Sequence, residues 1–183
     1  MNLPNKLTFI RLILTVPFIY FLEASNSNGI IYRLIAFAIF VIASLTDFFD
    51  GYIARKYNLV SNFGKVMDPL ADKILVISAL VVFVKLDYIP SWMSIVVIAR
   101  EFLISGIRIL AASNGEVIPA GKLGKYKTTS QMIVILLMML TGKYVRILGI
   151  NINMMYLMLI PVILTIWSGI EYTSKAKHYF LNQ

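Results

Sequence analysis

Apolar residues gather into six long stretches that are separated by short polar segments. Each stretch is close to the roughly 20 residues that an α-helix needs to cross a bilayer. The stretches cover residues 7–22, 30–50, 64–86, 91–112, 126–142 and 147–171. The segments between them contain the glycine and polar residues that are typical of turns. The pattern predicts an all-α integral membrane protein with six transmembrane helices, which form a single domain over residues 1–183.

The composition agrees with this fold class. Hydrophobic residues make up 59% of the chain and charged residues 14%, whereas a soluble domain carries about 25% charged residues. Cysteine is absent and His178 is the single histidine, so metal or acid–base chemistry has to come from carboxylates. In a membrane protein, the net charge of +8 indicates anionic lipid headgroups and phosphorylated substrates as partners, and no nucleic acid.

The basic residues predict how the helices are oriented. With a cytoplasmic N-terminus, the inner segments carry nine Lys and Arg residues and the outer segments carry three. The inner residues are Lys6, Arg55, Lys56, Lys65, Lys122, Lys125, Lys127, Lys175 and Lys177, and the outer ones are Lys85, Lys143 and Arg146. Because basic residues concentrate in cytoplasmic loops, we expect both termini in the cytoplasm. Residues 1–6 lead into the first apolar stretch without a cleavage site, so we expect no removable signal peptide.

Charged residues interrupt two of the predicted spans. The third span contains Asp68, Asp72 and Lys73, and the fourth contains Arg100, Glu101 and Arg108. A charged side chain inside a span costs roughly 2.5–3.5 kcal/mol, so it normally faces a bundle interior or a water-filled cavity. We therefore expect a polar cavity, open to the cytoplasmic side. Arg100 and Glu101 fit either structural pairing or a functional contact, and because neighbours on a helix do not face each other, we expect their partners elsewhere.

Four aspartates are predicted to lie at one membrane depth. Asp47 and Asp50 are three residues apart near the end of the second span, and Asp68 and Asp72 are four apart near the start of the third. Each pair therefore projects from one helical face. Clustered carboxylates repel one another, so bound cations are the expected compensation. An oxygen-only donor set favours Mg²⁺ or Mn²⁺, and four carboxylates can hold two ions.

Small and basic residues accompany the aspartates. Gly51 and Ala54 follow Asp47 at helical spacing, and Gly64 precedes Asp68 by four residues. Small side chains let a ligand approach the helix backbone, while Arg55 can offer its planar guanidinium to a phosphate. The pattern indicates a pocket for a metal-bound diphosphate.

The whole arrangement resembles the signature of the CDP-alcohol phosphatidyltransferase family, D-x-x-D-G-x-x-A-R-x8-G-x3-D-x3-D. All eight defining positions match, between Asp47 and Asp72. The resemblance implies that two divalent cations hold a CDP-linked donor, whose β-phosphorus is attacked by an alcohol with release of CMP. Asp47, Asp50 and Asp68 would be metal ligands, and Asp72 would be the general base and would also touch the second metal. Gly51, Ala54, Arg55 and Gly64 would contact the cytidine diphosphate.

Flanking residues bear on the acceptor alcohol. Asn2-Leu3-Pro4-Asn5-x-Leu7-Thr8-x-x-Arg11, Ala99-Arg100-Glu101 and Gly124-Lys125-x-Lys127-Thr128-x-x-Gln131 resemble segments of the bacterial phosphatidylglycerophosphate synthases within this family. This resemblance implies CDP-diacylglycerol as donor and glycerol 3-phosphate as acceptor. It also implies a bacterial homodimer in the cell membrane, with the active site facing the cytoplasm. A cationic cradle suits a phosphorylated acceptor, and its candidates are Thr8, Arg11, Arg108, Lys125 and Lys127.

Several alternatives remain open. The acceptor can instead be phosphatidylglycerol, inositol phosphate or serine, and the aspartates can serve ion pairing or a divalent-cation carrier. A carrier has no evident need for Gly51, Ala54 and Arg55 in register with the aspartates. Lys125 and Lys127 also fit ordinary cytoplasmic loop residues, and Arg11 also fits a side chain that extends to the membrane surface.

Overall fold

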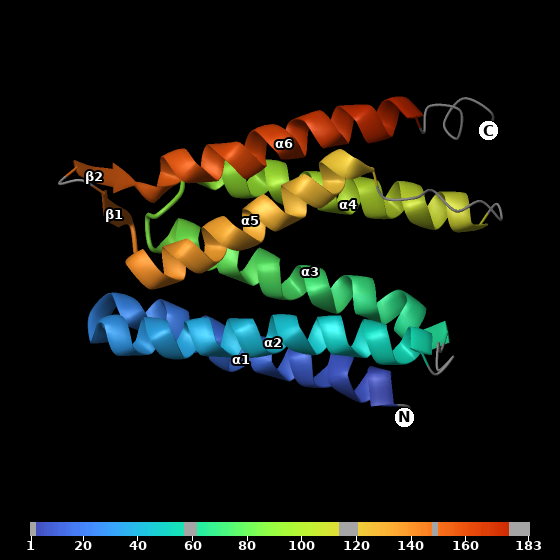
Figure 1. The fold of residues 1–183 in the computed structure, drawn as a ribbon, viewed down its shortest axis with the longest axis horizontal. Helices are drawn as coiled ribbons and strands as arrows, with labels where there is room; N and C mark the ends of the chain where they lie inside the picture. Colours follow the sequence, from blue (N-terminus) through green and yellow to red (C-terminus); the bar gives the residue numbers. More distant parts are fainter. Residues whose placement is uncertain (1–2, 57–61, 114–120, 148–149, 176–183) are drawn as a thin grey trace. The chain divides into compact units, whose positions relative to one another are not determined.

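The computed structural model describes residues 3–56, 62–113, 121–147 and 150–175, and the side chains of residues 8–46, 73–111, 121–146 and 151–174. In this part of the chain, six helices and one β-hairpin follow one another (Figure 1). They are α1 (Leu3–Asn28), α2 (Ile30–Lys56), α3 (Asn62–Lys85), α4 (Ser91–Ser113), α5 (Lys122–Thr141), β1 (Tyr144–Ile147), β2 (Ile150–Asn153) and α6 (Met154–Lys175). The chain divides into two compact units, which are described separately. Unit 1 comprises Met1–Leu86 with Met139–Thr141, and unit 2 comprises Asp87–Met138 with Gly142–Gln183.

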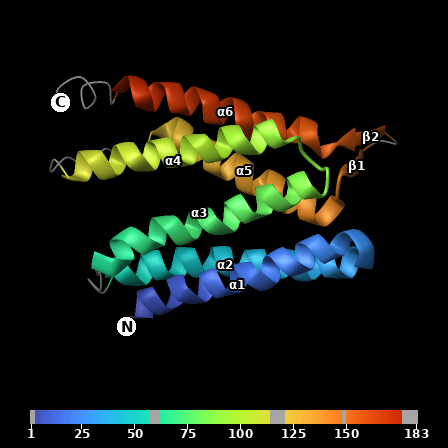
Figure 2. The same cartoon turned by 180° about the vertical axis from the view of Figure 1, so that it is seen from behind.

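Unit 1 is built on the packing of α1 against both α2 and α3 (Figures 1 and 2). Phe18 of α1 and Phe40 of α2 are completely buried, and their ring centroids lie 5.4 Å apart. Ala36 and Ala43 are buried on α2, and Ala79 on α3. Small residues at such interfaces let helix backbones approach closely, which is how helices pack when lipid surrounds them.

Unit 2 is built on the packing of α4 against α6. Ile104, Ile107 and Ala111 of α4 form a buried cluster with Tyr172 of α6, and Leu110 packs against it. The hairpin precedes α6, and its strands pair antiparallel with Val145 opposite Ile152. Asn153 then caps α6, because its Oδ1 accepts the backbone N–H of Met155 at 2.9 Å.

The hairpin corrects the prediction for the sixth apolar stretch. That helix was expected over residues 147–171, but α6 begins at Met154. Helix α5 ends at Gly142, which has φ 81° and donates its N–H to Met138 O at 2.9 Å. The β-branched residues that follow, at 145, 147, 150 and 152, favour strands. The all-α expectation is therefore wrong for residues 144–147 and 150–153, although the helical class is confirmed.

The exposed surface of the helices is apolar while several polar groups are buried. Val16 is 69% exposed and Ile109 71%, whereas Arg11 is completely buried. Among the described residues, Thr8–Asn28 and Met154–Ser174 are long and apolar enough to cross a membrane. This distribution suits a protein whose surroundings are lipid. The other four spans and the orientation of the termini stay predictions.

One ion pair in unit 2 joins the turn that follows α3 to the turn that follows α5. Lys143 Nζ donates to Asp87 Oδ2 at 2.5 Å, and Asp87 has a positive φ of 57°. The hydrogen bond to Asp87 holds the pKa of Lys143 above its ordinary value. Lys143 therefore stays charged near neutral pH.

The close packing of α1 on α2 can be tested at Ala43, which is completely buried. Ala43→Leu places a larger side chain in a closed interface, and such overpacking costs about 1–3 kcal/mol. Ile42→Leu on the neighbouring residue, 54% exposed, is the matched control and should leave stability unchanged. Thermal unfolding of both purified variants in detergent measures the difference, and equal midpoints would contradict the packing described.

Candidate functional site

The aspartates of the predicted metal site lie on two helices of unit 1. The backbone is helical at Asp47 and Asp50 in α2 and at Asp68 and Asp72 in α3, so each pair has the spacing that puts it on one helical face. The carboxyl end of α2 and the amino end of α3 lie at the same end of unit 1 (Figures 1 and 2). The side chains of residues 47–72 lie outside the described residues. The carboxylate box therefore stays a prediction.

The same holds for the donor pocket. Gly51, Ala54 and Arg55 are in α2, and Gly64 is in α3, while their contacts lie outside the part that the structure describes. The described side chains contain no cluster of three or more carboxylates, histidines or cysteines that could hold a metal ion. Carboxylates alone, as on residues 47–72, form a donor set that suits Mg²⁺ or Mn²⁺.

Thr8 and Arg11 lie in the first turns of α1, at the end of unit 1 where α2 ends and α3 begins (Figures 1 and 2). Thr8 is 2% exposed and Arg11 is completely buried. The backbone carbonyl of Arg11 also accepts the hydroxyl of Thr15 at 2.9 Å. A side chain that extends to the membrane surface ends in water, so the surface alternative for Arg11 is wrong. The structure therefore places a buried cation at this end of unit 1.

Unit 2 contains a charged triad on α4 and α5. Glu101 Oε1 accepts Arg100 Nη1 at 3.1 Å and Lys127 Nζ at 2.5 Å. The Lys127 side chain is only 3% exposed. The alternative that Lys127 is an ordinary loop residue is therefore wrong. Lys127 is the distant partner expected for Glu101, but the expectation that Arg100 and Glu101 do not meet is also wrong, because the long arginine side chain reaches its neighbour.

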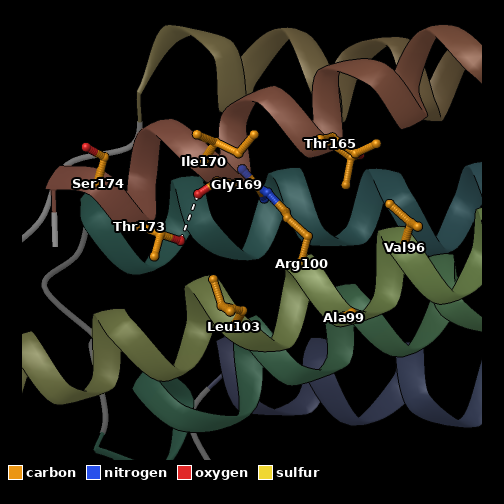
Figure 3. Close-up of a pocket in the computed structure, with 10 residues that line it drawn as sticks. Val96, Ala99, Arg100, Leu103, Thr165, Gly169, Ile170, Thr173 and Ser174 are labelled. Atoms are coloured by element: carbon orange, nitrogen blue, oxygen red, sulfur yellow. Dashed lines mark hydrogen bonds between the residues drawn. The ribbon is translucent and has the colours of Figure 1, made fainter. Parts of the chain in front are cut away.

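Arg100 also lines a pocket of about 680 Å³ between α4 and α6 (Figure 3). Its side chain extends toward Gly169, whose backbone carbonyl accepts the Thr173 hydroxyl at 2.9 Å. A Cβ at Gly169 would lie 3.4 Å from Arg100 Cγ, and one at Gly124 would lie 3.5 Å from Arg100 Nη2. Both distances are ordinary van der Waals contacts, so Arg100 packs closely beside the two glycines, and the pocket walls are otherwise mainly apolar.

Arg108 has a different environment from Lys127. Its side chain is exposed, and its Nε donates to the Tyr172 hydroxyl at 2.9 Å. The guanidinium carbon also lies 5.6 Å from the centre of the Tyr172 ring. The sequence offered no signal for Tyr172, because the two residues are 64 positions apart.

The five candidates for binding the acceptor phosphate differ in exposure and in the unit to which they belong. Arg108 and Lys125 are exposed on unit 2, while Lys127 is buried and paired. Thr8 and Arg11 belong to unit 1. The assembly of all five into one site stays a prediction.

Comparison with known proteins gives two consistent findings. The model of the CDP-alcohol phosphatidyltransferase family matches residues 1–167. A Bacillus subtilis protein named CDP-diacylglycerol–glycerol-3-phosphate 3-phosphatidyltransferase is 42% identical over 183 residues, which cover 95% of this chain and 94% of the relative. A Rickettsia felis protein of the same name is 40% identical over 179 residues, covering 98% of this chain and 97% of the relative.

The charged triad makes a prediction about stability. Glu101→Gln removes the carboxylate partner of the buried Lys127, and the expected loss is about 3 kcal/mol, the lower end for a broken buried ion pair. Glu23→Gln is the matched control, since Glu23 pairs with Lys85 at 2.7 Å on the surface, where side-chain exposures are 36% and 63%. Such a pair is worth about 0–1 kcal/mol. Unfolding of the purified variants in detergent compares the two, and an equal loss would refute the structural role of Glu101.

Proposed function

The chain belongs to the CDP-alcohol phosphatidyltransferase family, and we propose that it transfers a phosphatidyl group from CDP-diacylglycerol to sn-glycerol 3-phosphate. The products are phosphatidylglycerophosphate and CMP, so the reaction is a step of phospholipid synthesis. The observation that carries the proposal is the complete motif between Asp47 and Asp72. Relatives that bear the name of this transferase match almost the full length of the chain and support the choice of reaction.

The proposed chemistry divides the aspartates by role. Asp47, Asp50 and Asp68 hold two divalent cations, and Gly51, Ala54, Arg55 and Gly64 contact the cytidine diphosphate. The primary hydroxyl oxygen of glycerol 3-phosphate attacks the β-phosphorus, and Asp72 accepts the hydroxyl proton. The bond from that phosphorus to the CMP oxygen breaks, and CMP leaves with the electron pair. Mg²⁺ or Mn²⁺ held by these aspartates would supply positive charge to the diphosphate and to the leaving CMP.

The acceptor is proposed from charge on unit 2. Exposed Arg108 and Lys125 offer positive charge to a phosphate, and charge-assisted hydrogen bonds to phosphate are stronger than neutral ones. Serine or choline carries no such group. The basic residues also support an active site on the cytoplasmic side of a bacterial cell membrane with six spans, and family membership supports a homodimer.

The acceptor assignment predicts the outcome of a direct assay. Purified protein in mixed micelles with CDP-diacylglycerol should release CMP only when glycerol 3-phosphate and either Mg²⁺ or Mn²⁺ are both present. Phosphatidylglycerol, serine and inositol phosphate are tested in parallel, with CMP and the lipid product both quantified. Turnover with one of these and none with glycerol 3-phosphate would overturn the acceptor while leaving the family intact.

The roles of the aspartates predict different losses. Asp72→Asn should abolish turnover while keeping most of the metal and CDP-lipid affinity, because it removes a base. Asp68→Asn should weaken turnover and metal affinity together, because it removes a ligand. Asp87→Asn, at a turn residue whose side chain is 90% exposed, should keep both. Turnover and Mn²⁺ affinity are measured on the same preparations, and near-normal turnover of Asp72→Asn would exclude its role as base.

A further inference from the structure

The contact between Arg108 and Tyr172 holds one side of an exposed guanidinium. Arg108 Nε donates to the Tyr172 hydroxyl at 2.9 Å. In the part of the chain that the structure describes, no other hydrogen bond or ion pair involves Arg108. A guanidinium has five N–H donors, of which one belongs to Nε. Within the described residues, the four donors on the terminal nitrogens have no protein partner, so they can serve a ligand.

Tyr172 is itself held rigidly. Its side chain is 8% exposed, and it lies in the buried cluster with Ile104, Ile107 and Ala111 of α4. Its hydroxyl accepts the Arg108 Nε–H, so the ring and the hydroxyl both restrict the arginine, the ring at 5.6 Å from the guanidinium carbon. A fixed guanidinium loses less conformational entropy when it binds an anion than a free one does.

Two other cations of unit 2 have a charged partner instead of a neutral one. Lys127 and Arg100 both donate to the carboxylate of Glu101, so an anion would compete with a carboxylate for them. Arg108 donates to a neutral hydroxyl, and its full positive charge remains. A planar fork of this kind matches the oxygens of a phosphate better than a lysine does.

We propose that Tyr172 is a positioning residue, which orients Arg108 to bind the phosphate group of glycerol 3-phosphate. The inference rests on the proposed function, because it names the group that holds the acceptor of that reaction. The proposal gives Tyr172 no contact with the reacting hydroxyl or with the donor. Its hydroxyl acts through Arg108 alone.

Tyr172→Phe tests the inference, since it removes the hydroxyl and keeps the buried ring. The KM for glycerol 3-phosphate should rise about fivefold, the size of one lost hydrogen bond, while kcat and the KM for CDP-diacylglycerol change less than twofold. Tyr156→Phe on the same helix is the matched control, because Tyr156 is 60% exposed, and it should leave all three constants unchanged. Thermal unfolding of each variant verifies that the fold is kept.

A second variant separates positioning from packing. Arg108→Lys keeps the positive charge but removes the guanidinium Nε–H that Tyr172 accepts. The KM of this variant for glycerol 3-phosphate should rise at least as much as that of Tyr172→Phe. Adding Tyr172→Phe to it should then change the KM less than twofold, because the two residues act as a unit. A further fivefold rise in the double variant, or an unchanged KM in Tyr172→Phe alone, would overturn the positioning role.

A binding measurement separates a failure of this inference from a failure of the proposed function. The affinity for glycerol 3-phosphate is measured by calorimetry on the wild-type protein and on Tyr172→Phe, both with Mg²⁺. Binding that weakens about fivefold in the variant supports the inference even if the wild-type protein produces no phosphatidylglycerophosphate. Turnover of glycerol 3-phosphate by the wild type with equal affinity in the variant refutes the inference and keeps the function. A wild type that neither binds nor converts glycerol 3-phosphate refutes both.

Discussion

The cost of placing charge in apolar surroundings is the constraint on which the rest of the structure depends. The helices expose apolar side chains such as Val16 and Ile109, so an ionised group among them has to find a partner or a polar cavity. In unit 2, one carboxylate serves two cations, since Glu101 accepts both Arg100 and Lys127. This pairing ties α4 to α5. A charge that would be costly alone thus becomes part of the packing.

The same constraint separates structural cations from those available to a ligand. Lys127 is buried against a carboxylate, and the described structure accounts for its charge. Arg108 is exposed, and its described partner is the neutral hydroxyl of Tyr172. Sequence patterns treat the two residues alike, because both are basic residues near the ends of apolar stretches. Only the partner shows which of them has positive charge left to offer.

The lengths of the apolar stretches were sufficient to predict the helices that carry the aspartates. The helical periods at Asp47 and Asp50, and at Asp68 and Asp72, are present in α2 and α3, and the family suggested by the motif is confirmed. The hairpin before α6 was missed, because the apolar isoleucines at 147, 150 and 152 were assigned to the sixth stretch. The contact of Arg108 with Tyr172 was missed because it joins α4 to α6, and no local pattern reports tertiary pairing.

The charges proposed to meet the substrates have opposite signs in the two units. The aspartate motif in unit 1 contains four carboxylates, for which divalent cations are the proposed counter-charge. The predicted cytoplasmic ends of α4 and α5 in unit 2 carry exposed Arg108 and Lys125, which attract anions. A phosphatidyl transfer from a diphosphate to a phosphorylated alcohol supplies both counter-charges, because the donor arrives with metal ions and the acceptor with its own phosphate. In the proposed reaction, the aspartates of unit 1 therefore serve the donor, and the exposed basic residues of unit 2 serve the acceptor.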